Sequence, residues 1–288
     1  MKGAISVIEN VVYAHDAERK WIQNHPTVQY EAYLLKRIIK LIMEKYKQSN
    51  IFSYDALTQD GVMITDEYKI SLLCDADIIF LMKNLDQESV IEYFERKNRR
   101  HPLWKSESEY KAIFNRGFTD KIFEIVEHSL EDLCKHLNFV CGSQEINKEA
   151  LEACEKDLEK MHELIRRDAK RKEQYEVLIE EKKKNLKWIR VLEQFANDQK
   201  IPFDFVIIKA NQFTSGFTKD AFGKIKIEFD SKRDSCYFGQ VTNVLKAEKS
   251  MRDKFYYLYY KQPEEKTYID LNAFAILLGK TAMEDVFK

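Results

Sequence analysis

Apolar residues recur every three or four positions along the first half of the chain, the spacing that places side chains on one face of an α-helix. This spacing predicts one helix over residues 4–24 and a second over 27–47. The sequence Asn-His-Pro at 24–26 separates them, because proline disfavours helical backbone at the residue before it. The next segment, 51–71, has only short apolar alternations and predicts a loop or a small hairpin. One or two further helices are expected within 107–137.

The most distinctive stretch is residues 72–105, with the sequence LLCDADIIFLMKNLDQESVIEYFERKNRRHPLWK. Its first predicted helix opens with Asp75 and Asp77, and aspartates at a helix start are typical capping residues. A second amphipathic helix is predicted to end at Pro102, because proline lacks the backbone donor that a helix requires. A cluster of basic side chains lies near that end, made of Arg96, Lys97, Arg99 and Arg100.

The second half begins with a segment, 146–200, that contains neither glycine nor proline. Its apolar spacing lapses only at 166–174, which predicts two long helices, either continuous or folded as a hairpin. Such charged pairs usually pack on each other or on a second subunit. Beyond Pro202 the period changes to two, which is typical of strands. Strands are predicted over 203–207, 225–229 and 256–260, and a closing helix over 270–284.

The predicted fold is therefore mainly α: a helical bundle with two long charged helices and a small C-terminal α+β module. We expect three parts, namely a helical domain over 1–142, the long helix or helical hairpin over 143–200, and a small α+β domain over 201–288.

Composition supports a soluble, folded chain. Charged residues make up 33% and aromatic residues 12% of the sequence, and eight glycines and four prolines leave room for long helices. Five cysteines without CxxC spacing indicate reduced thiols and a cytoplasmic protein. No apolar run approaches the roughly 20 residues of a membrane span. The net charge of −1 gives no drive toward nucleic acid or an anionic membrane, so neither is expected as a partner.

The order CDADIIFLMK, then RRHPLWK, resembles the region C-terminal to the catalytic core of HD-superfamily dNTP triphosphohydrolases, such as the SAM-and-HD-domain enzymes. In that family a helix beginning (T/D)D-x-I-x-L precedes a helix that ends in R-x-L-F-K. The corresponding element here, residues 100–105, is one residue longer. The resemblance implies that Arg100 and Lys105 contact an activating nucleotide, the effector, at a subunit interface. The other interpretation is a solvated helix end whose cations complement the helix dipole.

The same resemblance extends to the first helix pair, which in the family follows the last catalytic aspartate and lines the nucleotide pocket. The matching segment here is IENVVYAHDAERKWIQNHPTVQYEAYLLKRI. His25 falls on the terminal histidine of the family pattern, His15 stands where an arginine is usual, and Gln23 where a tyrosine is usual. Arg19 lies four residues from both His15 and Gln23, so it shares their helix stripe. The resemblance implies nucleotide binding by His15, Arg19, Gln23 and His25.

The dipeptide His15-Asp16 has the letters of the HD metal motif, but two ligands cannot close a coordination shell. No histidine precedes His15, so we expect a helix-surface pair and predict no metal-binding or catalytic residue in this chain. The complete enzyme is expected to hold a divalent metal such as Mg²⁺ or Mn²⁺ on residues outside these 288. The isolated chain is predicted to be inactive.

Two functions remain open. The first is the C-terminal portion of an HD-type hydrolase of (deoxy)nucleoside triphosphates, or a stand-alone relative that has lost catalysis. It would contribute substrate-pocket, effector-site and oligomer contacts, with a homo-oligomer or an upstream HD-containing segment as partner. The second is a non-catalytic helical scaffold that binds a partner chain through the long helices of 146–200.

Overall fold

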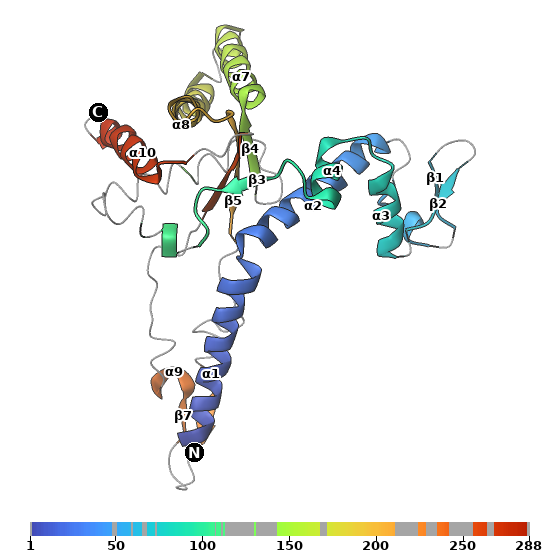
Figure 1. The fold of residues 1–288 in the computed structure, drawn as a ribbon, viewed down its shortest axis with the longest axis vertical. Helices are drawn as coiled ribbons and strands as arrows, with labels where there is room; N and C mark the ends of the chain where they lie inside the picture. Colours follow the sequence, from blue (N-terminus) through green and yellow to red (C-terminus); the bar gives the residue numbers. More distant parts are fainter. Residues whose placement is uncertain are drawn as a thin grey trace. The chain divides into compact units, whose positions relative to one another are not determined.

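The structure is a computed structural model with two compact units, and Figure 1 labels its elements along the chain. Unit 1 comprises residues 1–29 and 101–288, and unit 2 comprises residues 30–100. The structure describes residues 2–47, 51–58, 60–64, 68–72, 74–106, 108–110, 112, 130, 143–167, 172–210, 224–228, 235–241, 256–263 and 268–286. Among these residues the chain is mainly α, as predicted.

The described helices agree closely with the apolar spacing of the sequence. They are α1 (Lys2–Glu18), the π-helical turn η1 (Arg19–Gln23), α2 (Pro26–Lys45), the 3-10 turn η3 (Asp55–Leu57), α3 (Asp75–Lys83), α4 (Glu88–Glu95), α7 (Lys148–Arg167), α8 (Lys172–Gln199), α9 (Phe238–Val241) and α10 (Leu271–Val286). The helices predicted within 107–137 lie almost wholly outside the described residues. No helix in the described part of the chain is long and apolar enough to cross a membrane.

Unit 1 is built around a four-stranded sheet with the strand order β3-β8-β5-β4. The strands are β3 (Arg100–Pro102), β4 (Ser143–Asn147), β5 (Asp204–Lys209) and β8 (Tyr256–Lys261), and β5 pairs antiparallel with both β4 and β8. A separate pair, β6 (Lys226–Glu228) and β7 (Ser235–Tyr237), is also antiparallel. The strands predicted over 203–207, 225–229 and 256–260 are thus confirmed.

Both central strands of this sheet are buried on both faces. On one face Phe205 of β5 packs near Phe195 of α8, which in turn contacts Phe274 of α10. On the other face Tyr257 and Tyr259 of β8 direct their hydroxyl groups at the backbone between α1 and α2. Two aromatic residues of β8 therefore anchor the Asn24–Pro26 backbone, which belongs to the same unit.

Strand β4 was not predicted, because the helical segment was expected to begin at Ile146 and no element was expected just before it. In the structure β4 precedes the long helices and pairs along its whole length with β5, which follows them. Of its three described side chains only Ile146 is fully buried, so the strand has too few apolar positions to show a period of two. One sheet thus combines β3 from 1–142, β4 from 143–200, and β5 and β8 from 201–288.

The two long helices predicted between 146 and 200 are confirmed as α7 and α8. Buried Leu151, Cys154 and Leu158 line the inner side of α7. Two ion pairs connect the helices, from Lys182 to Asp157 at 2.7 Å and from Arg190 to Glu155 at 2.8 Å. The hydrogen bond from Lys182 lowers the pKa of the Asp157 carboxyl group.

Unit 2 has a core of its own, formed by α2, α3, α4 and the hairpin of β1 (Val62–Met63) and β2 (Lys69–Ile70). The aspartates predicted to cap α3 include Asp77, whose carboxylate accepts the backbone N–H of Cys74 at 2.9 Å. Gly61 has φ +60° beside the carbonyl oxygen of Ile70, where any β-carbon would collide. Only glycine fits this position, just before β1, without strain.

The prediction that the helix after α3 ends at Pro102 was wrong. Helix α4 ends at Glu95, because Arg96 adopts the left-handed conformation with φ 57° and stops the helical hydrogen-bond pattern. Asn98 is also left-handed, with φ 55°. Pro102 lies instead in β3, an edge strand, where a missing backbone donor is tolerated. The basic residues after Glu95 therefore lie in a loop and a strand rather than on a helix.

Candidate functional site

The break between α1 and α2 is held in place by the central sheet of unit 1. The hydroxyl group of Tyr257 donates to the carbonyl oxygen of Asn24 at 2.7 Å, and that of Tyr259 donates to the carbonyl oxygen of Pro26 at 2.6 Å. Asn24 and Pro26 are buried, whereas His25 between them is exposed. Two buried hydrogen bonds from one strand thus fix the backbone on either side of the His25 side chain.

The imidazole of His25 also has a defined orientation. Its Nδ1 accepts the backbone N–H of Thr27 at 3.3 Å, the hydrogen bond of a helix N-cap, and Pro26 occupies the first position of α2. Because Nδ1 accepts a proton donor, the proton of the neutral ring belongs on Nε2. Nε2 is then a hydrogen-bond donor on an exposed side chain, which suits an anionic oxygen such as that of a phosphate group.

The other three predicted nucleotide-binding residues lie on the helix that leads to this break. His15 is half-buried on α1. Gln23 is exposed, and its side-chain amide donates to the Glu18 carboxylate at 3.3 Å. The side chain of Arg19 lies outside the described residues. Residues 19–23 form a π-helical turn, which has more residues per turn than an α-helix. The i+4 spacing of His15, Arg19 and Gln23 therefore does not place all three side chains on one face.

The first predicted effector residue, Arg100, lies inside a polar cluster of unit 2. Only 9% of its side chain is exposed, and its guanidinium group lies 3.9 Å from the Glu92 carboxylate and donates to the Tyr30 hydroxyl at 3.3 Å. Tyr30 donates in turn to Glu92. Burial raises the pKa of the Tyr30 hydroxyl, and Glu92 raises it further, against the opposing effect of Arg100. A phosphate ligand of Arg100 would have to replace Glu92 as its partner.

The second predicted effector residue, Lys105, belongs to unit 1 and is exposed. Its backbone N–H donates to the Glu109 carboxylate at 2.6 Å. The neighbouring Trp104 is fully buried and donates its indole N–H to the carbonyl oxygen of Tyr256 at 2.9 Å. The basic-aromatic element therefore combines one exposed cation with an aromatic anchor in the core.

The described residues do not fit a metal site. No three histidine, cysteine, aspartate or glutamate side chains gather there as metal ligands. The side chain of Asp16, the partner of His15 in the HD dipeptide, lies outside the described residues.

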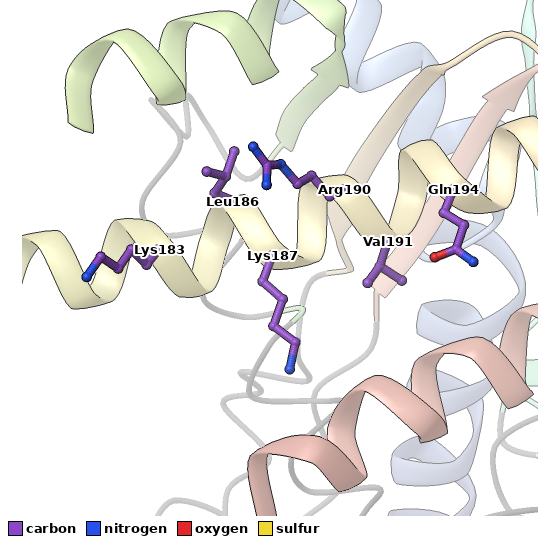
Figure 2. A pocket seen from close by; sticks show the side chains of 6 residues that line it. All are labelled: Lys183, Leu186, Lys187, Arg190, Val191 and Gln194. Carbon is purple, nitrogen blue, oxygen red and sulfur yellow. The ribbon is translucent and has the colours of Figure 1, made fainter. Parts of the chain in front are cut away.

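The sequence did not indicate a hollow of about 370 Å³ along α8. Figure 2 shows Leu186 and Arg190 pointing toward α7, and Lys187, Val191 and Gln194 toward α10. Because Lys187 and Arg190 extend toward different helices, the spacing of the cations along α8 gave no signal of a common site. Lys183, Lys187 and Arg190 have carboxylate partners at 2.8 to 3.5 Å, namely Glu180, Glu284 and Glu155. An anionic ligand would have to compete with those ion pairs.

No family model, curated protein or solved structure matches this chain.

Proposed function

We propose that this chain is the C-terminal portion of an HD-type metal-dependent phosphohydrolase acting on (deoxy)nucleoside triphosphates. Its part is to supply substrate-pocket, effector-site and oligomer contacts, with the divalent metal held by residues outside these 288. The proposal starts from the resemblance of CDADIIFLMK and RRHPLWK, and of the Asn-His-Pro segment, to the region that follows the metal ligands in that family.

The observation that carries the proposal is the fixed position of His25. Tyrosine hydroxyls from β8 hold the backbone on both sides of it, and the Thr27 N–H fixes its ring. A binding residue needs such support, because a side chain that is ordered in advance loses less entropy when the ligand binds. In the proposed pocket, Nε2 of His25 donates to a phosphate oxygen of the nucleotide, and Lys105 contributes a point charge at the effector site.

Replacing His25 by asparagine is the sharpest test of this role. Asparagine is a good N-cap and keeps a hydrogen bond to the start of α2, but it lacks the Nε2 donor. A hydrogen bond to a charged group contributes about 1.5–3 kcal/mol, so the dissociation constant of a dNTP with Mg²⁺ should rise roughly 10- to 100-fold. Isothermal titration calorimetry of the 288-residue chain measures this change.

The matched control is His162→Asn, because His162 is an exposed histidine on α7. The His162→Asn variant should bind dNTP with the same dissociation constant as the parent. Both asparagine variants should have the melting temperature of the parent. A His25→Ala variant loses the cap as well and should be about 1 kcal/mol less stable. If the parent chain binds no dNTP, or if His25→Asn binds as tightly as the parent, the proposed pocket is wrong.

A second candidate function, a helical scaffold that binds a partner chain, has support from α7 and α8. Leu164 on α7 and Val177 and Leu178 on α8 are exposed, whereas most other apolar positions of these helices are buried or half-buried. In long charged helices such positions commonly contact another helix. This role predicts an oligomer whose mass, measured by light scattering, falls to that of a monomer in a Val177→Glu, Leu178→Glu variant. Ile276→Glu on α10 should leave the mass unchanged. If the parent chain is already a monomer, α7 and α8 do not bind a second copy of this chain.

A further inference from the structure

Helix α7 is attached to unit 1 through a narrow apolar stripe. Among its described side chains only Leu151, Cys154 and Leu158 are buried. Met161 and Ile165 continue the same stripe, but both are half-buried. Elements with few buried apolar contacts are the ones that open locally while the rest of a protein stays folded. The packing of α7 is therefore weaker than that of the central strands of the sheet.

The ion pairs between α7 and α8 add little to this packing. In the Lys182–Asp157 pair 49% of the Asp157 side chain is exposed, and in the Arg190–Glu155 pair 59% of the Arg190 side chain is exposed. Exposed ion pairs contribute weakly to stability, because water and salt screen their charges. The association of α7 with α8 thus depends mainly on the apolar stripe between them.

A buried amide on α8 acts against this association. Asn185 is 1% exposed, and neither its side-chain nitrogen nor its side-chain oxygen has a hydrogen-bond partner in the described part of the chain. Trp188 and Ile189, one turn further along α8, are buried and apolar. A buried amide without a partner has lost its hydrogen bonds to water and gained none in return. Asn185 therefore favours an arrangement in which water reaches it.

Asn185 lies in the part of α8 that runs alongside α7. It is one helical turn after Lys182 and precedes Arg190, and both of these cations pair with carboxylates of α7. Cys154 of α7 belongs to the same region: burial raises the pKa of its thiol, and the nearby charge of Lys182 opposes that rise. The unpaired amide and the buried thiol thus lie in one packed segment of the helix pair.

We propose that α7 separates from α8 while the rest of unit 1 stays folded, and that Asn185 keeps this opening accessible. When the helices part, water binds the amide of Asn185 and the thiol of Cys154 becomes exposed. The start of α7 stays on the sheet, because β4 pairs with β5 and the Asn147 side chain accepts the backbone N–H of Ala150 at 2.9 Å. The helix pair is then a conformational switch. It uses no residue of the proposed nucleotide pocket and none of the positions that test the scaffold role, so each can fail without the others.

The rate at which iodoacetamide alkylates Cys154 in the whole chain measures the opening, because the closed pair protects the thiol. Mass spectrometry of the peptide that contains Cys154 follows the reaction, and the exposed Cys74 of unit 2 is the internal standard. We expect alkylation without denaturant at a rate that changes little in low urea. Local opening exposes less surface than complete unfolding, so it depends less on urea.

Replacing Asn185 by leucine should slow the alkylation of Cys154 at least tenfold, because an apolar side chain of similar size loses nothing by staying buried. The matched control is Asn197→Leu, which changes an exposed asparagine of the same helix and should leave the rate as in the parent. Leu158→Ala removes one of the three buried side chains of α7 and should raise the rate at least tenfold. The reaction of Cys74 should be the same in all variants.

Three results overturn the proposal. The first is alkylation of Cys154 only as fast as unit 1 unfolds completely, as judged by tryptophan fluorescence in the same urea. The second is an Asn185→Leu variant that does not fold or whose Cys154 reacts as fast as in the parent. The amide then has a partner in the closed pair, such as a buried water molecule. The third is an unchanged rate in Leu158→Ala, since α7 is then not held by its apolar stripe.

Discussion

Replacing Trp104 by alanine is expected to destabilise unit 1 by about 3–5 kcal/mol, the range for removing a large aromatic side chain from a core. Trp104 is fully buried, and its ring lies 5.2 Å from that of Tyr110 and 6.3 Å from that of Phe274. The variant leaves a cavity next to α10 and removes the hydrogen bond to the Tyr256 carbonyl group on β8. Urea unfolding followed by tryptophan fluorescence measures the loss.

The fluorescence signal is specific because all three tryptophans, Trp21, Trp104 and Trp188, belong to unit 1. Trp188 is buried on α8 and reports on unfolding in the Trp104→Ala variant. Trp104→Phe keeps the aromatic packing and loses the N–H donor, so a smaller loss of about 1–3 kcal/mol is expected. Trp21→Ala removes a side chain that is 73% exposed and should change stability by less than about 0.5 kcal/mol. Equal stability of the Trp104→Ala and Trp21→Ala variants would show that Trp104 does not anchor the core of unit 1.

The elements of this fold that depend on neighbours in sequence could be predicted. Helices α1, α2, α7, α8 and α10 follow from apolar spacing, and the break at Pro26 and the cap of α3 follow from the local chemistry of proline and aspartate. The central strands β5 and β8 could also be predicted, because the apolar period changes to two beyond Pro202.

The elements that depend on distant partners could not be predicted from the sequence. Strand β4 exists because Ser143–Asn147 pairs with a strand about sixty residues later, and its own five residues do not form a pattern. The end of α4 depends on the left-handed backbone of Arg96, a conformation that is uncommon for any residue except glycine. The π-helical turn at Arg19–Gln23 changes which side chains share a face, and no simple residue pattern predicts it.

The candidate site shows the same division. The sequence indicates that His25 lies at a helix break, but the tyrosines that fix this break are 233 residues away in the chain. Arg100 was expected at a solvated helix end or at a phosphate group, since the sequence alone does not show that Glu92 and Tyr30 lie beside it. Whether a basic residue is available to a ligand depends on such tertiary partners, which periodicity does not reveal.

Replacing Glu92 by alanine is expected to destabilise unit 2 by about 3–5 kcal/mol, the range for removing one partner of a buried ion pair. Only 5% of the Glu92 side chain is exposed, and it is the carboxylate partner of both Arg100 and Tyr30. Without it the buried charge of Arg100 loses its carboxylate partner at 3.9 Å. Unit 2 contains no tryptophan, so hydrogen exchange of the amide groups in α2, α3 and α4, followed by mass spectrometry, measures the change.

The origin of this loss is tested by removing both charges together. In a Glu92→Leu, Arg100→Met variant no charge is left unpaired and the side-chain volumes are similar, so most of the stability lost in Glu92→Ala should return. Lys97→Ala is the control, since the Lys97–Glu95 pair is exposed and its loss should be within about 0.5 kcal/mol. If the double variant exchanges as fast as Glu92→Ala, the hydrogen bond to Tyr30 is the main contribution. Arg100 would then not depend on Glu92 for its place in the fold, and exchange of that carboxylate for a nucleotide phosphate would cost little.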